Sequence, residues 1–243
     1  MRHHSSALCL FSLLLILNAS CEPQTEENGE ARARAAAERV TPELEPELEK
    51  QSLRIGDRVF LRAFKEEGQL EVWMQPEGAE EFVLFRSYPI AAQSGNLGPK
   101  EAEGDFQVPE GFYAFGERHL NPRSSYHLSF NIGYPNEYDR FHDRTGSYIM
   151  VHGSRVSIGC LAMTDPVIEE IYTLCSAALQ AGQPFIRIHL FPFRLEPDEL
   201  NEFRDKEWYG FWLNLEEGYR NFEENRVPPN TTVRDGQYQF APE

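Results

Sequence analysis

Three features of the sequence predict a mainly β fold of the α+β class, with a few helices. From Leu53 onward, runs of alternating apolar and polar residues are separated by turns that contain glycine, a pattern typical of antiparallel strands. One amphipathic helix pattern follows, and an aromatic helical pattern lies near the C-terminus. With 41% hydrophobic residues in 243, the chain can bury one sizeable core, which excludes a collagen-like or wholly disordered protein.

The strand predictions depend on this alternation and on the turns between the runs. The first three runs are separated by Glu-Gly or Pro-Glu-Gly, residues that favour tight turns. The last run, 184–193, is almost continuously apolar, as expected of a buried strand. The predicted strands are 58–65, 69–75, 81–91, the end of the turn-rich stretch 95–115, 126–133, 146–153 and 184–193.

Two helical regions are predicted. In the first, Asp165 can cap the helix, Pro166 suits its first position, and Gly182 ends it. Its apolar residues recur at spacings of three and four. Residues 198–226 are mostly helical and aromatic, and residues 238–240 close the chain. The predicted domain is residues 53–243, including this C-terminal helical extension.

The N-terminus predicts export. Arg2 precedes an apolar stretch, 8–17, that is about half of the ~20 residues needed to span a bilayer, so residues 1–21 fit a signal peptide. The end of this stretch resembles a bacterial lipobox, although Asn18 stands where an apolar residue is usual. Lipidation of Cys21, a cleaved soluble form and an uncleaved anchor are the alternatives. The expected location is the periplasm or cell envelope, at the outer membrane if Cys21 is lipidated.

Residues 22–52 predict a linker. They are rich in Glu, Ala, Arg and Pro and contain few large apolar residues, so they cannot form a core of their own. Such a segment would tether the domain to the membrane. The alternative is a helix that lies on the domain surface.

The net charge of −16 comes mainly from this linker and the C-terminal segment. Because no stretch is strongly basic, nucleic acid is not an expected partner. Four cysteines are too few for a disulfide scaffold. His119, His127, His142 and His189 show no metal-ligand spacing, so neither a metal nor another cofactor is expected.

Residues 149–160 carry the clearest chemical signal. A predicted strand ends at His152-Gly153, and the turn Ser157-Ile158-Gly159-Cys160 follows. A cysteine nucleophile needs a base to take its proton, and a nearby imidazole can do so. Gly159 permits a tight turn whose N–H groups can face an oxyanion. A lone cysteine or histidine is usually a packed residue, but their order in this sequence favours catalysis.

These residues resemble the active-site signature of the L,D-transpeptidase (YkuD-type) family, in which a strand ending in His-Gly precedes a Ser/Thr-x-Gly-Cys turn. The longer run HGSRVSIGCLAMTDPVIEEIY, with HLFPFRL and WYGFWLNLEEGY downstream, is similar to its YafK-like branch. Upstream, GPKEAEGDFQVPEG resembles another stretch of the family. The resemblance implies a β-rich catalytic domain that forms a cysteine acyl-enzyme with peptidoglycan stem peptides containing a diamino acid.

Carried over to this chain, the resemblance implies that Cys160 is the nucleophile and His152 the general base. Gly159 and Cys160 would supply N–H groups to the oxyanion, and the Gly153 carbonyl would orient the imidazole. Two features depart from the family: the interval between His152 and Ser157 is short, and Ala162 replaces a common arginine.

Several other residues have two interpretations each. Ser157 is expected to hydrogen-bond within its turn, and Cys175 to pack on the helix, with a Cys160–Cys175 disulfide as the alternative. Arg144 would either bind a substrate carboxylate or lie on the surface. The residues in stretches expected to line the cleft are Tyr126, His127, Arg140 and Arg144.

The function implied is acyl transfer from a Cys160 thioester to an amine, in cell-wall remodelling. The first alternative is hydrolysis, which would trim stem peptides or release a wall-linked lipoprotein, as associated with YafK-like relatives. An inactive wall-binding module is less consistent, because both His152 and Cys160 are present. A papain-like protease would need a Cys-Gly-Ser/Ala-Cys-Trp/Tyr signature, which the sequence lacks.

Overall fold

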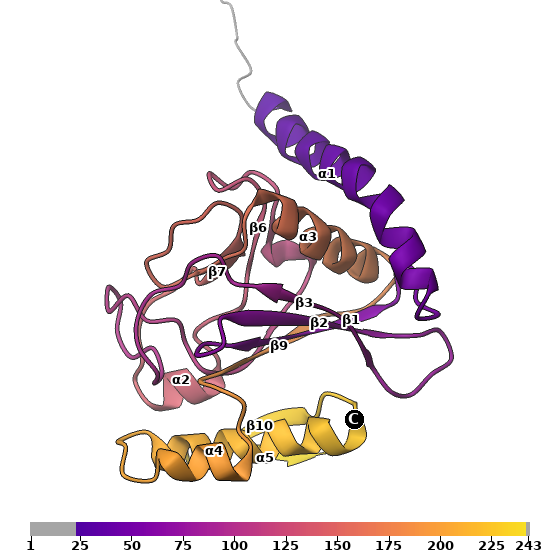
Figure 1. Cartoon of the computed structure of the whole chain (residues 1–243). Helices are drawn as coiled ribbons and strands as arrows, with labels where there is room; N and C mark the ends of the chain where they lie inside the picture. The colour runs from indigo at the N-terminus through magenta and orange to yellow at the C-terminus, as the bar shows by residue number, and fades with distance from the viewer. Residues whose placement is uncertain (1–22, 242–243) are drawn as a thin grey trace, which may run out of the picture.

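A computed structural model describes residues 23–241, and the predicted signal peptide and Cys21 lie outside this range. The domain is built on a five-stranded mixed sheet in the order β3-β2-β1-β9-β4 (Figure 1). β1 pairs antiparallel with β2 and parallel with β9. The strands are β1 (Arg58–Phe64), β2 (Gln69–Gln75), β3 (Val83–Pro89), β4 (Gly111–Phe115) and β9 (Ile186–Phe191).

A second sheet of four short strands carries the segment that the sequence singles out. Its order is β5-β6-β7-β8, and β7 pairs antiparallel with β6 and parallel with β8. His152 ends β7, opposite Ser129 of β6 and Ala162 of β8. The strands are β5 (Leu120–Asn121), β6 (Ser129–Asn131), β7 (Met150–His152) and β8 (Leu161–Ala162). Two of them are shorter than the predicted strands 126–133 and 146–153.

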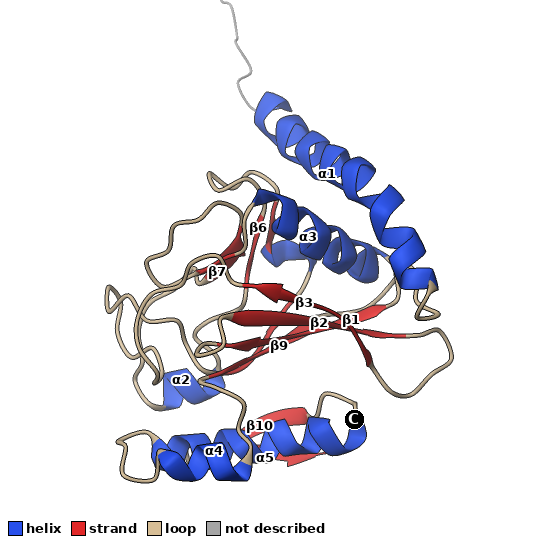
Figure 2. Ribbon diagram, viewed as in Figure 1, coloured by secondary structure: helices blue, strands red, loops and turns tan. Residues whose placement is uncertain are grey.

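Helices cover both faces of the five-stranded sheet (Figures 1 and 2). α3 (Asp165–Gln180) lies on one face and packs with the sheet in the largest apolar cluster. α4 (Pro197–Glu202) and α5 (Tyr209–Asn225) lie on the other, with the hairpin of β10 (Asn230–Arg234) and β11 (Gln237–Ala241). Residues 198–226 therefore form two helices, and β10 is a strand without a sequence prediction. The remaining helical elements are η1 (Glu117–His119) and α2 (Glu137–Phe141).

Most of the predicted linker is a helix that packs on the domain. α1 (Pro23–Glu49) contacts α3, and Ala36, Leu44 and Leu48 are buried in the same cluster as the α3 core residues. This corrects the tether interpretation for these residues and matches the surface-helix alternative. Small and apolar side chains recur on one face of α1, although Pro42 and Pro46 lie inside the helix.

Both faces of β1 and β2 are buried, although the sequence of each strand alternates between apolar and polar residues. Val59, Leu61 and Ala63 face the α3 cluster, whereas the intervening side chains of β1 face the C-terminal layer. Among the latter, Arg62 is 1% exposed. The polar positions of these strands are therefore buried, in contrast to the half-solvated sheet that alternation alone indicates.

Buried charges join the sheet to the C-terminal layer. Arg62 pairs with Glu71 at 2.8 Å and with Glu223 of α5 at 2.5 Å. Arg194 also donates to Glu71 at 2.8 Å, as does the Trp73 indole N–H. Burial by itself raises the pKa of Glu71, but the Arg62 charge and these hydrogen bonds outweigh it, so that its pKa lies below the ordinary value. Glu71 thus stays ionised between two arginines.

Within residues 23–241, none of the helices is both long enough and apolar enough to cross a membrane.

Replacing Glu71 by glutamine should lower the free energy of unfolding by about 3 kcal/mol at pH 7, because it leaves Arg62 buried with one acidic partner fewer. Glu77→Gln, which breaks an exposed pair with Arg54, is the matched control and should cost less than about 1 kcal/mol. Urea denaturation measures both changes.

The loss of unfolding free energy in the Glu71→Gln variant should also depend on pH. Because the folded-state pKa of Glu71 is lowered, its carboxylate stabilises the fold above the pKa of the unfolded chain, and this stabilisation is lost as the pH falls through the folded-state value. The gap between parent and variant should therefore shrink in acid. A constant gap from pH 7 to pH 3 would contradict the proposed role of the ionised carboxylate.

Candidate active site

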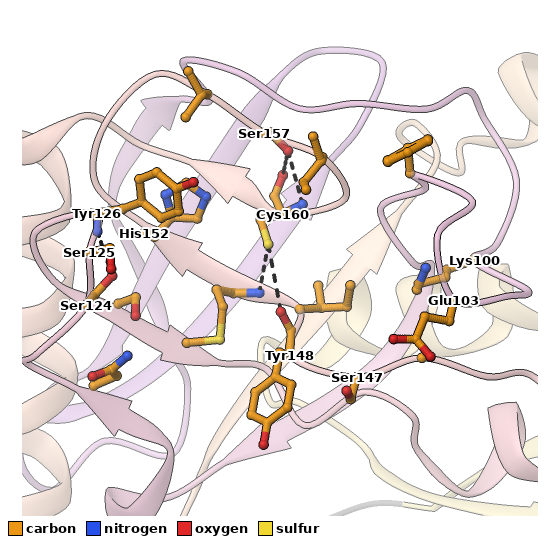
Figure 3. Close-up of a pocket in the computed structure, with 18 of the residues that line it drawn as sticks. Lys100, Glu103, Ser124, Ser125, Tyr126, Ser147, Tyr148, His152, Ser157 and Cys160 are labelled. Carbon is orange, nitrogen blue, oxygen red and sulfur yellow. Dashed lines mark hydrogen bonds between the residues drawn. The ribbon is translucent and has the colours of Figure 1, made fainter.

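The predicted cysteine and histidine line one cavity of about 710 Å³ (Figure 3). β7 supplies His152, and the turn before β8 supplies Cys160. Residues 100–106 and 146–148 form other parts of the wall. The cavity is lined by Lys100, Glu103, Gly104, Phe106, Asn121, Ser124, Ser125, Tyr126, Ser129, Gly146, Ser147, Tyr148, Ile149, Met150, His152, Val156, Ser157, Ile158 and Cys160.

The Cys160 sulfur contacts two backbone groups, one in β7 and one in the segment just before it. The Met150 N–H donates to Sγ at 3.4 Å, and the thiol donates to the Tyr148 carbonyl at 3.8 Å. Burial raises the pKa of the Cys160 thiol above its ordinary value, while the Met150 N–H and the charge of Lys100 oppose this rise. In the free protein, the thiol is therefore protonated at neutral pH.

His152 is held in one tautomer. Its side chain is buried, and Nδ1 lies 2.5 Å from the Gly153 carbonyl oxygen. Since a carbonyl only accepts hydrogen bonds, Nδ1 must carry the proton, and Nε2 is left with a lone pair. Burial lowers the pKa of His152, and the bond to Gly153 offsets part of this effect. The imidazole is thus neutral at pH 7 and able to accept a proton.

Together, these shifts indicate the resting protonation state of the Cys160–His152 pair. A cysteine paired with a charged imidazolium would be a resting thiolate. Here burial favours the neutral forms of both Cys160 and His152. At rest, the proton is therefore on the Cys160 sulfur, and Nε2 of His152 is unprotonated.

Ser157 organises the cysteine turn. Its Oγ accepts hydrogen bonds from the N–H groups of Cys160 at 3.0 Å and Gly159 at 3.3 Å, and donates to the Cys160 carbonyl at 2.6 Å. Gly159 has φ +120°, which side-chain-bearing residues rarely adopt. Ser157 is thus a turn residue, as the sequence predicts. In the free protein, both N–H groups assigned to an oxyanion are hydrogen-bonded to Ser157.

Asp165 has a role that the sequence does not reveal. Its carboxylate accepts a hydrogen bond from the Ser154 N–H at 2.8 Å, and the N-cap position of α3 is occupied by Thr164. A Cβ on Gly153 would lie 2.5 Å from Asp165 Oδ1 and 2.7 Å from the Tyr126 carbonyl oxygen, so the backbone here requires glycine. Asp165 therefore fixes the loop after His152 instead of capping α3. An aspartate at a helix start gives no signal that separates these roles.

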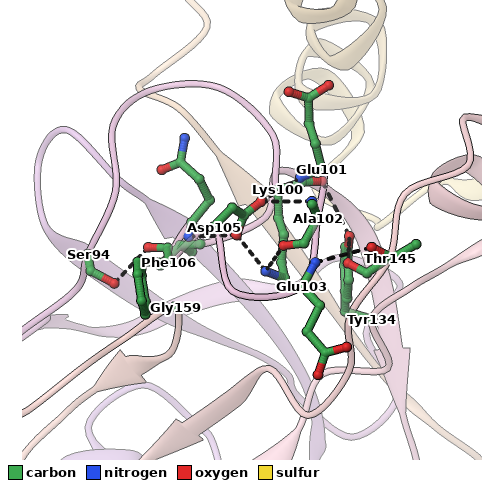
Figure 4. A network of polar contacts seen from close by, with 12 residues as sticks. Ser94, Lys100, Glu101, Ala102, Glu103, Asp105, Phe106, Tyr134, Thr145 and Gly159 are labelled. Atoms are coloured by element: carbon green, nitrogen blue, oxygen red, sulfur yellow. Dashed lines mark hydrogen bonds and ion pairs between the residues drawn. The ribbon is translucent and has the colours of Figure 1, made fainter.

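A loop built around Lys100 forms another wall of the cavity (Figure 4). The Lys100 ammonium is buried and bonds Asp105 at 2.5 Å and the Ala102 carbonyl at 2.8 Å. Asp105 also accepts N–H groups from Glu101, Ala102 and Gln107. The GPKEAEGD stretch is thereby closed into a compact turn, and the positive charge of its lysine offsets part of the rise that burial causes in the pKa of Cys160.

The four residues expected along the cleft lie in different places. Tyr126 lines the cavity, and its ring centroid is 4.8 Å from that of His152. His127 points away, with Nε2 2.6 Å from Glu169 of α3.

Neither arginine lines the cavity, which corrects that prediction. Arg144 is buried in an ion pair with Asp139 at 2.9 Å, so it is neither a surface residue nor a free carboxylate binder. Arg140 bonds the Pro135 carbonyl and lines a separate pocket beside β10. Sequence spacing could not separate them from true cavity residues, because the docking of α2, which contains Arg140 and precedes Arg144, has no signal in the sequence.

Cys160 and Cys175 are both free thiols, so the disulfide alternative is wrong. Cys175 is fully buried on the apolar face of α3, as predicted. Over residues 23–241, no three or more His, Cys, Asp or Glu side chains gather in a way that could hold a metal ion.

Comparison with known proteins decides the family. The YkuD family model, the L,D-transpeptidase catalytic domain, matches residues 67–188. The chain belongs to this family. It is 42% identical over 189 residues to the Escherichia coli (strain K12) protein named "Putative L,D-transpeptidase YafK", which covers 78% of this chain and 76% of that protein. The same figures hold for the protein of that name from Escherichia coli O157:H7.

Two solved bacterial structures match this chain in part. The helical cell shape determining protein Pgp2 (K307A mutant) from Campylobacter jejuni is 20% identical with a TM-score of 0.46, over 68% of this chain and 56% of that chain. Bd1075 from Bdellovibrio bacteriovorus is 17% identical with a TM-score of 0.40, over 76% and 84% of the two chains.

The YkuD match contains all of the cavity residues named above, from Lys100 to Cys160. Both α1 and the C-terminal layer of α4, α5, β10 and β11 lie outside the matched residues. The L,D-transpeptidase domain of this protein is therefore covered on both faces by segments that the family model does not describe.

Alkylation by iodoacetamide tests the protonation state of this YkuD cysteine. Because the pKa of Cys160 is raised, the thiol should react more slowly at pH 7 than a model thiol such as N-acetylcysteine, and its rate should rise with pH to a later inflection. Peptide mass spectrometry identifies the labelled cysteine. An inflection below that of the model thiol would contradict the raised pKa, and one below neutral pH would demonstrate a resting thiolate.

Proposed function

We propose that this protein is a cysteine acyltransferase that acts on peptidoglycan stem peptides through a Cys160 thioester. The observation that carries this proposal is the hydrogen bond from His152 Nδ1 to the Gly153 carbonyl, which reserves Nε2 as a proton acceptor in the cavity of Cys160. The family membership supports it, because L,D-transpeptidases act on peptide stems of peptidoglycan.

Acylation begins when Sγ attacks the carbonyl carbon of the donor amide. The S–H proton passes to His152 Nε2, and the new C–S bond gives a tetrahedral oxyanion. Collapse of this intermediate breaks the C–N bond, and the imidazolium returns its proton to the leaving amine. The neutral resting state suits this sequence, because the imidazole must first accept and then donate one proton.

The turn at Cys160 offers donors for the oxyanion. In the free protein, the N–H groups of Gly159 and Cys160 point to the neutral Ser157 hydroxyl. A charged oxygen forms stronger hydrogen bonds than a hydroxyl, so an oxyanion placed beside the turn would take over these donors. The Ser157 hydroxyl would keep its bond to the Cys160 carbonyl and hold the turn in shape.

The thioester has two fates that use the same residues. Attack by an amine gives transpeptidation, and attack by water gives hydrolysis, including release of any protein joined to the wall by such a bond. In both cases, His152 would deprotonate the acceptor and return the proton to sulfur. The proposed site of action is the cell envelope, in line with the predicted export signal in residues 1–21.

Cys160→Ala should abolish turnover of isolated muropeptides while leaving the fold intact, because the thiol sits in a turn at the cavity wall and contributes little packing. The reaction is followed by mass spectrometry of the products and of the protein, which should show an acyl adduct on Cys160 in the parent only. Addition of a free diamino acid separates the two fates, since transpeptidation incorporates it and hydrolysis does not.

Cys175→Ala is the matched control. It should keep full turnover and lose about 1 to 2 kcal/mol of stability, because its buried thiol packs in the α3 core. Undiminished turnover in Cys160→Ala, or loss of turnover in a folded Cys175→Ala protein, would overturn the assignment of the nucleophile.

A further inference from the structure

Helix α1 contacts the active-site region through residues 122–128, which precede β6. Gly29 allows this approach, because a Cβ at that position would lie 2.4 Å from Arg123 Cγ. Three residues further along α1, Arg32 Nη1 donates to the carbonyl oxygens of Ser124 at 2.9 Å and His127 at 2.8 Å. One guanidinium nitrogen thus bridges both ends of the turn 124–127.

A second link holds the same turn from α3. His127 Nε2 is 2.6 Å from Glu169, whose carboxylate also accepts a bond from Arg39 of α1, at 3.1 Å from Nε. His127 has φ +70°, a left-handed conformation that is unfavourable for a residue with a side chain. Such a conformation persists only when surrounding contacts enforce it. Here the enforcing contacts come from α1 and α3.

The turn carries Tyr126, whose ring lies over the imidazole of His152 (Figure 3). The ring centroids are 4.8 Å apart and the planes meet at 33°. Tyr126 is 47% exposed, so core packing does not fix its ring, and its place depends on the backbone of the turn. The Tyr126 carbonyl also lies against Gly153, the residue whose own carbonyl orients His152.

We propose that Arg32 is a positioning residue for the cysteine acyl transfer: by bridging the turn 124–127, it keeps Tyr126 over His152 and the Gly153 carbonyl at Nδ1. This inference rests on the proposed function. Arg32 acts through the turn and Tyr126 and does not line the cavity itself. The helix that follows the predicted export signal thereby becomes part of the support of the catalytic base.

The physical effect has two parts. An aromatic ring over the imidazole excludes water from one face, which keeps the histidine desolvated and neutral. A fixed Gly153 carbonyl keeps Nε2 aimed toward the cavity, and misplacement of a reacting group by about 1 Å can cost on the order of a hundredfold in rate. Loss of the bridge should therefore change both the titration of His152 and the turnover number.

The test compares Arg32→Met with Arg34→Met in the full chain. Arg34 lies on the same helix and forms an exposed pair with Glu30, so it controls for the loss of a positive charge. NMR titration of labelled histidine follows His152, with its signal identified by its absence in His152→Ala. In Arg32→Met, the pKa of His152 should rise toward its ordinary value and kcat should fall by roughly ten- to a hundredfold, whereas Arg34→Met should match the parent.

A double variant tests whether Arg32 acts through Tyr126. Tyr126→Ala should lower kcat and raise the pKa of His152, and adding Arg32→Met to it should change little further. Arg32→Lys retains the charge but not the planar guanidinium, and should fall between the parent and Arg32→Met. If Arg32→Met fails to fold, Arg32→Lys is used in its place.

The inference is overturned if the pKa of His152 in Arg32→Met, or in a folded Arg32→Lys, equals that of the Arg34→Met control. Additive effects of Arg32→Met and Tyr126→Ala would equally reject action through the tyrosine. Failure of the proposed function gives a different result. In that case the parent itself does not turn over muropeptides, while the NMR titration still reports whether Arg32 controls His152.

Discussion

Burial of both faces of the five-stranded sheet is the constraint on which the rest of the structure depends. One face meets α3 through aliphatic side chains, and the other meets α5 through aromatic rings and the Arg62–Glu71 pair. A charged pair in that position costs desolvation but defines which helix can lie there, since Glu223 of α5 completes it. With the sheet clamped between two layers, α3 is fixed, and its first residue anchors the loop that follows His152.

The candidate active site consists of two turns, one after His152 and one ending at Cys160, and side-chain hydrogen bonds stabilise both. Asp165 and Ser157 bind backbone N–H groups of the loop between β7 and β8, and these bonds fix the backbone that carries His152 and Cys160. The low polarity around them keeps both groups neutral. Cys160 and His152 are therefore uncharged at rest, and charge would develop only during attack on a substrate carbonyl. Oriented N–H groups stabilise such developing charge most effectively.

The sequence predicts well where one local rule dominates. Alternation gives β1 and β2, proline and glycine bracket α3, and the His-Gly and Ser-x-Gly-Cys elements indicate the site. It fails where long-range contacts decide. The burial of Arg62 requires a helix more than 140 positions away, and the Arg144 side chain packs against Phe211 of α5. Helix α1 packs on α3 despite two internal prolines. None of these has a periodic signal, because each is set by a partner that only the folded chain supplies.

The parallel pairing of β1 with β9 also governs when the domain can form. β1 lies at the centre of the sheet, yet one of its two neighbours begins only at Ile186, late in the chain. Contacts between residues so far apart in sequence form slowly, because closing the intervening loop reduces chain entropy before the stabilising contacts are made. A nascent chain that has yet to produce β9 therefore cannot complete its main sheet. The main sheet therefore stays incomplete during synthesis at least until Ile186–Phe191 has been added, whatever the stability of the strands made before it.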